Sequence, residues 1–285
     1  MPDFGIMRGF NDKLFGDKLY AGQLPTQLGL IGSQEVNDFD ADSVAFFNRV
    51  TAAGGSLSAT EKTAVNTLVV QMKADGTWTP MKAIYPMVGA SAAACAQNLK
   101  SSSFTGSFSS GWTFASTGIT TSGNAYMNTA LIPSTSLLLN DVHIGGYIRS
   151  VSSIAPLLSA EDVSSFNNAL YIWPTTTSYG GSVRINDNTS TTNSTLQNPQ
   201  GLHLATRTAS NEKKYRINKV EKFNVTAVST NLNTQSIRVA SGYNSGFSFV
   251  GEIAYITIGD GLTNAQCDLY VDAVQAFQTT LSRQV

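Results

Sequence analysis

Two histidines are the side chains of this 285-residue sequence that ordinarily titrate near neutral pH, and neither belongs to a catalytic pattern. His143 and His203 both stand in apolar, strand-like surroundings, which favours buried structural histidines over catalytic or metal-binding ones. Motifs for zinc proteases, serine hydrolases, dinucleotide binding and phosphate binding do not occur. The sequence therefore predicts no catalytic residue, no cofactor and no metal ion, and a protein that is not an enzyme.

The carboxyl groups of the sequence do not form a catalytic pattern either. Glycoside hydrolysis needs two of them facing each other across the substrate. Glu161 and Asp162 are adjacent and would point to opposite faces of a strand, so we interpret them as loop residues. The glutamates are scattered, and none shares an alternating strand motif with a second acid: Glu35, Glu61, Glu161, Glu212, Glu221 and Glu252.

The acidic run Asp38–Asp42 opens like a calcium-binding EF-hand loop. Ser43 stands where that loop needs glycine, and Arg49 where it needs the bidentate glutamate. Carboxylates at the start of a helix explain the run better, since they favour its dipole and free amides.

Aromatic side chains in loops or at strand ends could bind a sugar, because rings stack on sugar faces while Asn and Asp fix hydroxyls. The candidates for a glycan site are Trp173, Tyr179, Asp187 and Tyr243. Each could equally belong to the core or contact a neighbouring subunit, and both interpretations stay open.

One basic cluster occurs in the chain. It could bind an anion or a glycan, but we expect instead a solvated sheet edge on which lysines oppose strand addition. Its members are Lys213, Lys214, Arg216, Lys219 and Lys222.

Charge and hydropathy exclude several other classes. Charged residues make up 13% of the sequence and the net charge is −1, which argues against a nucleic-acid or anionic-membrane partner. No run of 18 apolar residues supports a membrane span, and the N-terminus lacks the pattern of a secretory signal. Cys95 and Cys267 are interpreted as free, buried thiols of a protein that folds in a reducing compartment, with a disulfide left open.

From about residue 104 onward, short segments rich in β-branched and aromatic residues alternate with Gly, Ser and Asn clusters. Many short strands without intervening helices indicate a mainly β sandwich or barrel. The polar stretch 186–200 is expected to be a long exposed excursion. The expected strands cover residues 111–114, 143–150, 169–173, 182–185, 202–206, 213–217, 236–240 and 247–258.

The end of the chain predicts an amphipathic helix. Thr263 can cap it, and an apolar stripe recurs at spacings of 3, 4, 3 and 4 residues, so it must lie against a hydrophobic surface. The stripe consists of Cys267, Tyr270, Val274, Phe277 and Leu281.

A pair of helices is expected before the strands. Asp40 or Asp42 can cap the first, which would bury three apolar residues and stop at the glycines 54–55. Residues 58–61 fit a capping box for the second helix. An apolar connector around Pro80 and Pro86 would follow. The residues expected to be buried are Val44, Phe47 and Val50 in the first helix, and Val65, Leu68, Val69 and Met72 in the second.

Residues 1–34 carry apolar anchors among many glycines, with no helical or strand period. A disordered tail is one interpretation. Docking on a partner is favoured, because aromatic residues are depleted in true disorder. The expected docking residues are Phe4, Phe10, Leu14, Phe15, Leu19, Tyr20 and Leu24.

The segments 249–263 and 277–285 resemble the closing strand and terminal helix of concanavalin/laminin-G-like domains, more narrowly those at the C-termini of bacteriophage virion proteins. Residues 122–129 resemble an early strand of that group, and residues 207–218 its central hairpin. Lys219 stands where the group's turn has glycine, which puts a type I′ turn in doubt. Residues 15–29 are similar to the N-termini of some phage structural proteins.

This resemblance implies a concanavalin-like antiparallel β-sandwich, or jelly roll, over residues 97–285, closed by the terminal helix. Before it would come a virion-anchoring segment over 1–34 and a helical connector over 35–96. The implied function is that of a fibre, spike or decoration protein of the virion, assembled in the host cytoplasm. It would bind other virion proteins and a host-surface glycan, as a homo-oligomer for which the family suggests a trimer. The alternatives are a capsid or collar protein without a host ligand, a lectin, and a glycoside hydrolase of the same fold.

Overall fold

In the computed structural model, the chain from Phe39 to Val285 folds around two β-sheets. The expected N-terminal docking segment and all seven of its anchor residues lie outside the described part of the chain. The described residues are 39–153, 155–162, 165–174, 181–193, 199–243 and 248–285.

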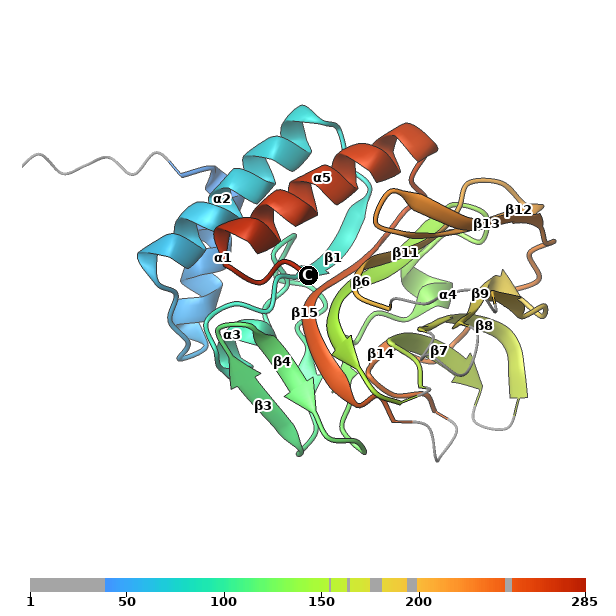
Figure 1. Ribbon diagram of the computed structural model, residues 1–285, viewed down its shortest axis with the longest axis horizontal. Coiled ribbons are helices and arrows are strands. Elements are labelled where there is room, and N and C mark those ends of the chain that lie inside the picture. Colours follow the sequence, from blue (N-terminus) through green and yellow to red (C-terminus); the bar gives the residue numbers. More distant parts are fainter. Residues whose placement is uncertain (1–38, 154, 163–164, 175–180, 194–198, 244–247) are drawn as a thin grey trace, which may run out of the picture. The chain divides into compact units, whose positions relative to one another are not determined.

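Two antiparallel sheets form the body of the unit (Figure 1). The first comprises β1 (Met81–Tyr85), β3 (Trp112–Ala115), β4 (Gly118–Thr121), β6 (Val142–Val151), β11 (Gly201–Arg207), β12 (Glu212–Ile217), β13 (Val220–Thr226) and β15 (Gly251–Gly259). Their order in this eight-stranded sheet is β13-β12-β11-β6-β15-β4-β3, and β1 also pairs with β15.

The second sheet has seven strands. They are β2 (Ser107–Phe108), β5 (Met127–Asn128), β7 (Leu158–Asp162), β8 (Ser165–Trp173), β9 (Gly181–Asp187), β10 (Thr191–Asn193) and β14 (Arg238–Val239). Their order is β10-β9-β8-β7-β14-β5-β2.

One hydrophobic core lies between the inner faces of the two sheets. It joins Ile144 and Ile256 of the eight-stranded sheet to Leu158, Ile172 and Ile185 of the seven-stranded sheet, all fully buried. Alternate residues of each strand face this core, as in other sandwiches. The predicted mainly β, concanavalin-like sandwich with a terminal helix is therefore confirmed.

A layer of helices covers the outer face of the eight-stranded sheet. The helices of the chain's described part are α1 (Ala41–Ala52), α2 (Ala59–Ala74), α3 (Ala92–Cys95), α4 (Pro133–Ser136) and α5 (Asn264–Thr280). Figure 1 shows α2 and α5 side by side above β1, β15, β6 and β11. Their second core joins Leu68, Tyr270 and Phe277 to Leu204 and Tyr255 of the sheet beneath.

The helix ends follow the predicted capping chemistry. Asp40 caps α1 by accepting from the backbone N–H of Asp42. Capping boxes begin both α2, between Ser58 and Glu61, and α5, between Thr263 and Gln266.

The expected apolar face of α1 was partly wrong. Val44 is 38% exposed. The buried positions are instead Ser43, Phe46, Phe47 and Val50. Counted from Ser43, the other three follow after 3, 4 and 7 residues, so the four form one stripe along the helix, and Val44 lies outside it.

The expected connector around residues 80–86 was also wrong, because Met81–Tyr85 forms strand β1. Ile84 pairs with Thr257, and Tyr85 pairs with Ile256. The flanking prolines lie just outside the strand, so every residue within it keeps a backbone N–H for the ladder.

Two further expectations concern single features. Cys95 and Cys267 are free and buried, as predicted.

The β12–β13 turn has two residues, and Asn218 adopts φ +52°. A type I′ turn needs positive φ at both central residues, and Lys219 lacks it, so the turn departs from that type as the missing glycine indicated. None of the helices within the described ranges is long and apolar enough to cross a membrane.

Candidate functional site

The outer face of the seven-stranded sheet carries aromatic and cationic side chains. Leu170 and Ile172 of β8 face the core. Because side chains alternate along a strand, Tyr171 and Trp173 point to the opposite, outer face. This face lies on the side of the sandwich away from α2 and α5, which pack on the other sheet.

Strand register aligns five residues across this face. Tyr171 lies opposite Arg184 on one side and Ser159 on the other. Arg238 lies opposite both Ser159 and Asn128. Directly opposed residues are the closest side-chain neighbours in an antiparallel sheet. We call this line, from Arg184 to Asn128, the outer row.

Aromatic contacts order one end of the outer row. The rings of Tyr171 and Trp173 have centroids 5.7 Å apart. The guanidinium of Arg184 lies 5.8 Å from the centroid of the Tyr171 ring. The Tyr171 hydroxyl is 3.3 Å from the hydroxyls of Ser182 and Ser190. This end thus combines the half-buried Trp173 ring with hydroxyl groups, while the Tyr171 ring is 5% exposed.

Two tyrosines contact Arg238 near the other end. Its guanidinium lies 4.3 Å from the centroid of the Tyr126 ring and 3.7 Å from that of Tyr243. Tyr243 is held in place because its backbone N–H donates to the Glu161 carboxylate at 3.1 Å and its hydroxyl donates to the Ser236 carbonyl at 2.9 Å.

Glu161 was expected in a loop, and that expectation was wrong. It belongs to β7 together with Asp162, next to a bulge between Ala160 and Asp162, and it is 1% exposed. The bulge removes the simple alternation on which the interpretation depended. Its carboxylate positions the Tyr243 segment.

The structure brings two of the four glycan candidates, Trp173 and Tyr243, to the same outer face of the sheet. Both are half-buried. Tyr179 lies outside the described residues. Sequence reasoning missed Tyr171, although its place two residues before Trp173 signals a shared face. It also missed Arg238, whose neighbours come from distant segments.

Asp187 cannot serve a surface ligand, which corrects the fourth candidate. It lies in β9 and is 1% exposed. Its carboxylate lies 3.0 Å from both Arg207 and Lys213. These belong to β11 and β12, so the cluster joins the two sheets.

Desolvation is the main electrostatic effect in this buried cluster. Arg207 and Lys213 are fully buried, and burial lowers the pKa of each, opposed by the Asp187 carboxylate. Arg207 also donates to the carbonyls of Ile185 and Ala227. Buried charges persist where such partners satisfy them.

The predicted basic sheet edge was wrong as well. β12 lies inside the sheet, with β13 beyond it at the edge. Lys213 is buried, and three other members are neutralised by acids: Lys214 by Glu212, Arg216 by Asp268 and Lys219 by Asp272. A cluster in the sequence became separate ion pairs because alternate residues of β12 face opposite sides.

Both histidines are buried in strands, as predicted. Burial lowers the pKa of His143 and of His203 to about 4. The ring nitrogens of His143 contact the Asp260 carbonyl and the Thr257 hydroxyl. Those of His203 contact the Tyr215 hydroxyl and the Pro199 carbonyl. Each neutral ring thus has partners for one donor and one acceptor.

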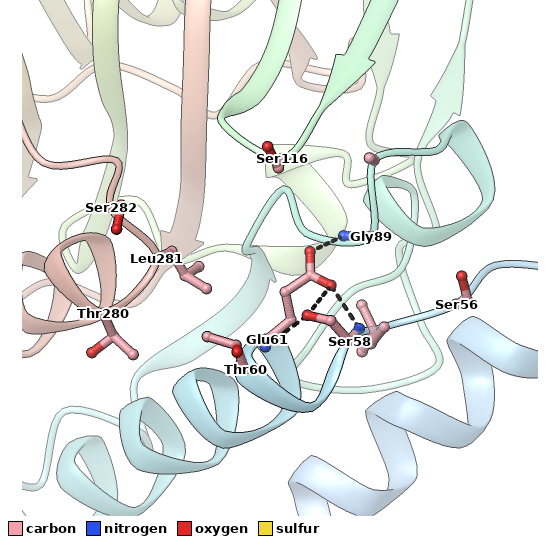
Figure 2. Close-up of a pocket in the computed structure, with 11 residues that line it drawn as sticks. Ser56, Ser58, Thr60, Glu61, Gly89, Ser116, Thr280, Leu281 and Ser282 are labelled. Carbon is pink, nitrogen blue, oxygen red and sulfur yellow. Dashed lines mark hydrogen bonds between the residues drawn. The ribbon is translucent and has the colours of Figure 1, made fainter.

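A groove of about 600 Å³ lies on the helical side of the unit (Figure 2). Figure 2 shows Glu61 lining it, with hydrogen bonds to Ser58 and Gly89. The Glu61 carboxylate accepts from the Gly89 N–H at 2.7 Å and from the Ser58 N–H at 2.8 Å. Since both carboxylate oxygens accept backbone hydrogen bonds, Glu61 joins the start of α2 to the Gly89 segment and so fixes this wall of the groove. The hydroxyls that line the groove come from Ser56, Ser58, Thr60, Ser116, Thr280 and Ser282.

Replacing Glu61 with alanine is expected to lower the free energy of unfolding by about 1–2 kcal/mol, because the α2 cap and the Gly89 bond are lost together. The denaturant midpoint would measure this loss. Glu221→Ala, at an exposed position of β13, is the control and should leave the midpoint unchanged. Equal midpoints for the two variants would contradict the role of Glu61.

No cluster of three or more His, Cys, Asp or Glu residues suited to a metal ion occurs within the described ranges. The sequence matches no family model and no curated protein.

Solved structures give distant likenesses. Domain 4 of AbnA, an extracellular GH43 arabinanase from Geobacillus stearothermophilus solved with arabinotriose, is 15% identical, with 67% of this chain and 98% of that chain covered and a TM-score of 0.48. The CBM40 of the Ruminococcus gnavus IT-sialidase, bound to α2,3-sialyllactose, is 13% identical, with 46% and 81% covered and a TM-score of 0.36. A heptameric SAP-like pentraxin from Limulus polyphemus is 10% identical, with 50% and 73% covered and a TM-score of 0.35.

Proposed function

We propose that this chain is a non-enzymatic structural protein of a bacteriophage virion whose β-sandwich binds a saccharide on the outer face of the seven-stranded sheet. The observation that carries the binding role is the gathering of Tyr171, Trp173 and Tyr243 with Arg184 and Arg238 on that face. The virion role is supported by the sequence of residues 1–34 and by the resemblance of the closing strand and helix.

The chemistry of the face suits a sugar. Aromatic rings offer apolar surface to the C–H face of a pyranose, and guanidinium groups donate several hydrogen bonds to hydroxyls. Trp173 is half-buried and can offer its ring, whereas Tyr171 is 5% exposed and lies beside Trp173 on the same strand, where it helps to hold that ring in place. A site built on strands holds its geometry better than one built on loops.

The absence of catalysis is part of the proposal. His143 and His203 are buried and hydrogen-bonded, and Asp187 is paired with two cations. Glu161 accepts the Tyr243 N–H. None of these groups forms an opposed acid pair of the kind that glycoside hydrolysis uses. The protein is expected to bind saccharides without releasing reducing ends.

The saccharide site is tested with the full chain on an array of bacterial surface polysaccharides. Trp173→Ala is expected to weaken binding of the recognised polysaccharide by about tenfold or more, the effect of losing roughly 1.4 kcal/mol of stacking. Phe39→Ala removes a half-buried ring beside α1 and should leave binding unchanged. Wild-type protein that binds no polysaccharide would refute the site and favour a purely structural capsid or collar protein.

The virion role needs a separate test. Phage particles assembled with a chain lacking residues 1–34 are expected to lack the protein, because the proposed docking segment is gone. Western blotting of purified particles would measure its incorporation. Normal incorporation of the shortened chain would contradict docking through this segment.

A further inference from the structure

Arg238 differs from most basic residues of the fold in having no acidic partner. Arg149, Arg207 and Arg216 each pair with a carboxylate. Arg238 forms no hydrogen bond or ion pair with the residues that the structure describes, and its Nε is shielded from solvent without an acceptor. Its contacts are the rings of Tyr126 and Tyr243.

The hydroxyl of Ser159 lies beside Arg238 and is also unsatisfied. Ser159 is fully buried, and its Oγ has no hydrogen-bond partner in the described structure. Leu158 and Ala160 face the core, so Ser159 faces the outer side, directly opposite Arg238. Unsatisfied buried polar groups cost stability, and a ligand that supplied a partner to both would remove that cost.

The two tyrosine rings favour a bound anion at this position. They contact the guanidinium at 4.3 and 3.7 Å and limit its movement, so little side-chain entropy remains to be lost on binding. A guanidinium presents parallel N–H donors that match a carboxylate in a bidentate pair. The Glu161 carboxylate of β7 accepts the Tyr243 N–H.

We infer that the saccharide bound on this face is an acidic one, whose carboxylate pairs with Arg238 beside the Ser159 hydroxyl while the aromatic side chains contact its sugar rings. This inference rests on the proposed saccharide site and adds the chemical class of its ligand. The carboxylate supplies the negative counter-charge that Arg238 lacks among the described residues. A neutral sugar would leave the guanidinium without an ionic partner.

The test uses three pairs of probes: tri-galacturonate, a hyaluronan tetrasaccharide and 3′-sialyllactose, each with its methyl ester. Esterification removes the charge and keeps the sugar. Titration calorimetry of the full chain at low ionic strength is expected to show that at least one acid binds about 10- to 100-fold more tightly than its ester. Added salt should reduce the difference.

Arg238→Gln is expected to weaken binding of the acid by the same factor and to bind acid and ester equally. Arg238→Lys keeps the positive charge but loses the planar guanidinium with its parallel N–H donors, so it should retain part of the preference for acid over ester. Lys219→Gln, which removes a solvent-exposed cation paired with Asp272, should behave as wild type. Ser159→Ala is expected to bind the acid more weakly without lowering the melting temperature, because the hydroxyl that it removes has no partner in the described structure.

The possible outcomes distinguish a failure of the acidic-ligand inference from a failure of the proposed saccharide site. Equal binding of acids and esters by the wild type would overturn the acidic ligand and leave the saccharide site standing. A preference that survives in Arg238→Gln would overturn the role of Arg238. No binding of any probe, together with no binding on the polysaccharide array, would refute both.

Discussion

Replacing Asp187 with asparagine is expected to lower the free energy of unfolding by about 3–5 kcal/mol, the range found when one partner of a buried ion pair is removed. Asparagine has nearly the same shape, so the loss reflects charge rather than a cavity. Arg207 and Lys213 would remain fully buried without a counter-charge. The carbonyls that also accept from them offset only part of that cost.

Thermal unfolding would measure the effect of Asp187→Asn. For a unit of this size the melting temperature should fall by about 6–20 °C. Asp272→Asn breaks an ion pair with Lys219 whose side chains are 61% and 51% exposed, and such pairs contribute about 0–1 kcal/mol. A fall of similar size in both variants would show that the buried cluster does not join the sheets as argued.

The sandwich and the terminal helix were predictable because their signals are local. Alternation and turn residues located β6, β8 and β11, and the spacing of apolar residues located α5. Capping residues such as Ser58 and Thr263 act within four positions of the chain, so their effect is readable from the sequence.

Features that depend on distant partners were not predictable. β1 has only five residues, and its strand character comes from β15, which lies more than 160 residues further along the chain. Asp187 looked like a loop residue until Arg207 and Lys213 became its neighbours across the sandwich. The sequence indicates a residue's type, whereas the fold decides which charges meet.

The candidate saccharide-binding face likewise combines features that local patterns predict with features that depend on distant strands. Alternation places Tyr171 and Trp173 together, and it could have been applied from the sequence alone. Register is what brings Ser159 between Tyr171 and Arg238. That register depends on the pairing of β7 with β8 and β14, which no local pattern specifies.

Acid is expected to destabilise the protein well before its carboxyl groups titrate, because two buried histidines resist protonation. Burial lowers the pKa of both His143 and His203 from 6.5 to about 4. Above pH 6.5 both rings are neutral in the folded and unfolded states. As the pH falls from 6.5 toward 4, the unfolded chain binds protons that the folded protein does not, so stability is lost.

The expected loss between pH 7.5 and pH 5 is about 2 kcal/mol for each histidine, with a slope of up to about 1.4 kcal/mol per pH unit each. Unfolded Asp and Glu titrate near pH 4, so they contribute little in this range. Denaturant midpoints measured across it would test the prediction. His203→Gln keeps a donor and an acceptor but does not titrate, so it should halve the slope even if it lowers stability at every pH. The double variant with His143→Gln should remove the slope, and a slope that persists there would show that other groups cause the acid sensitivity.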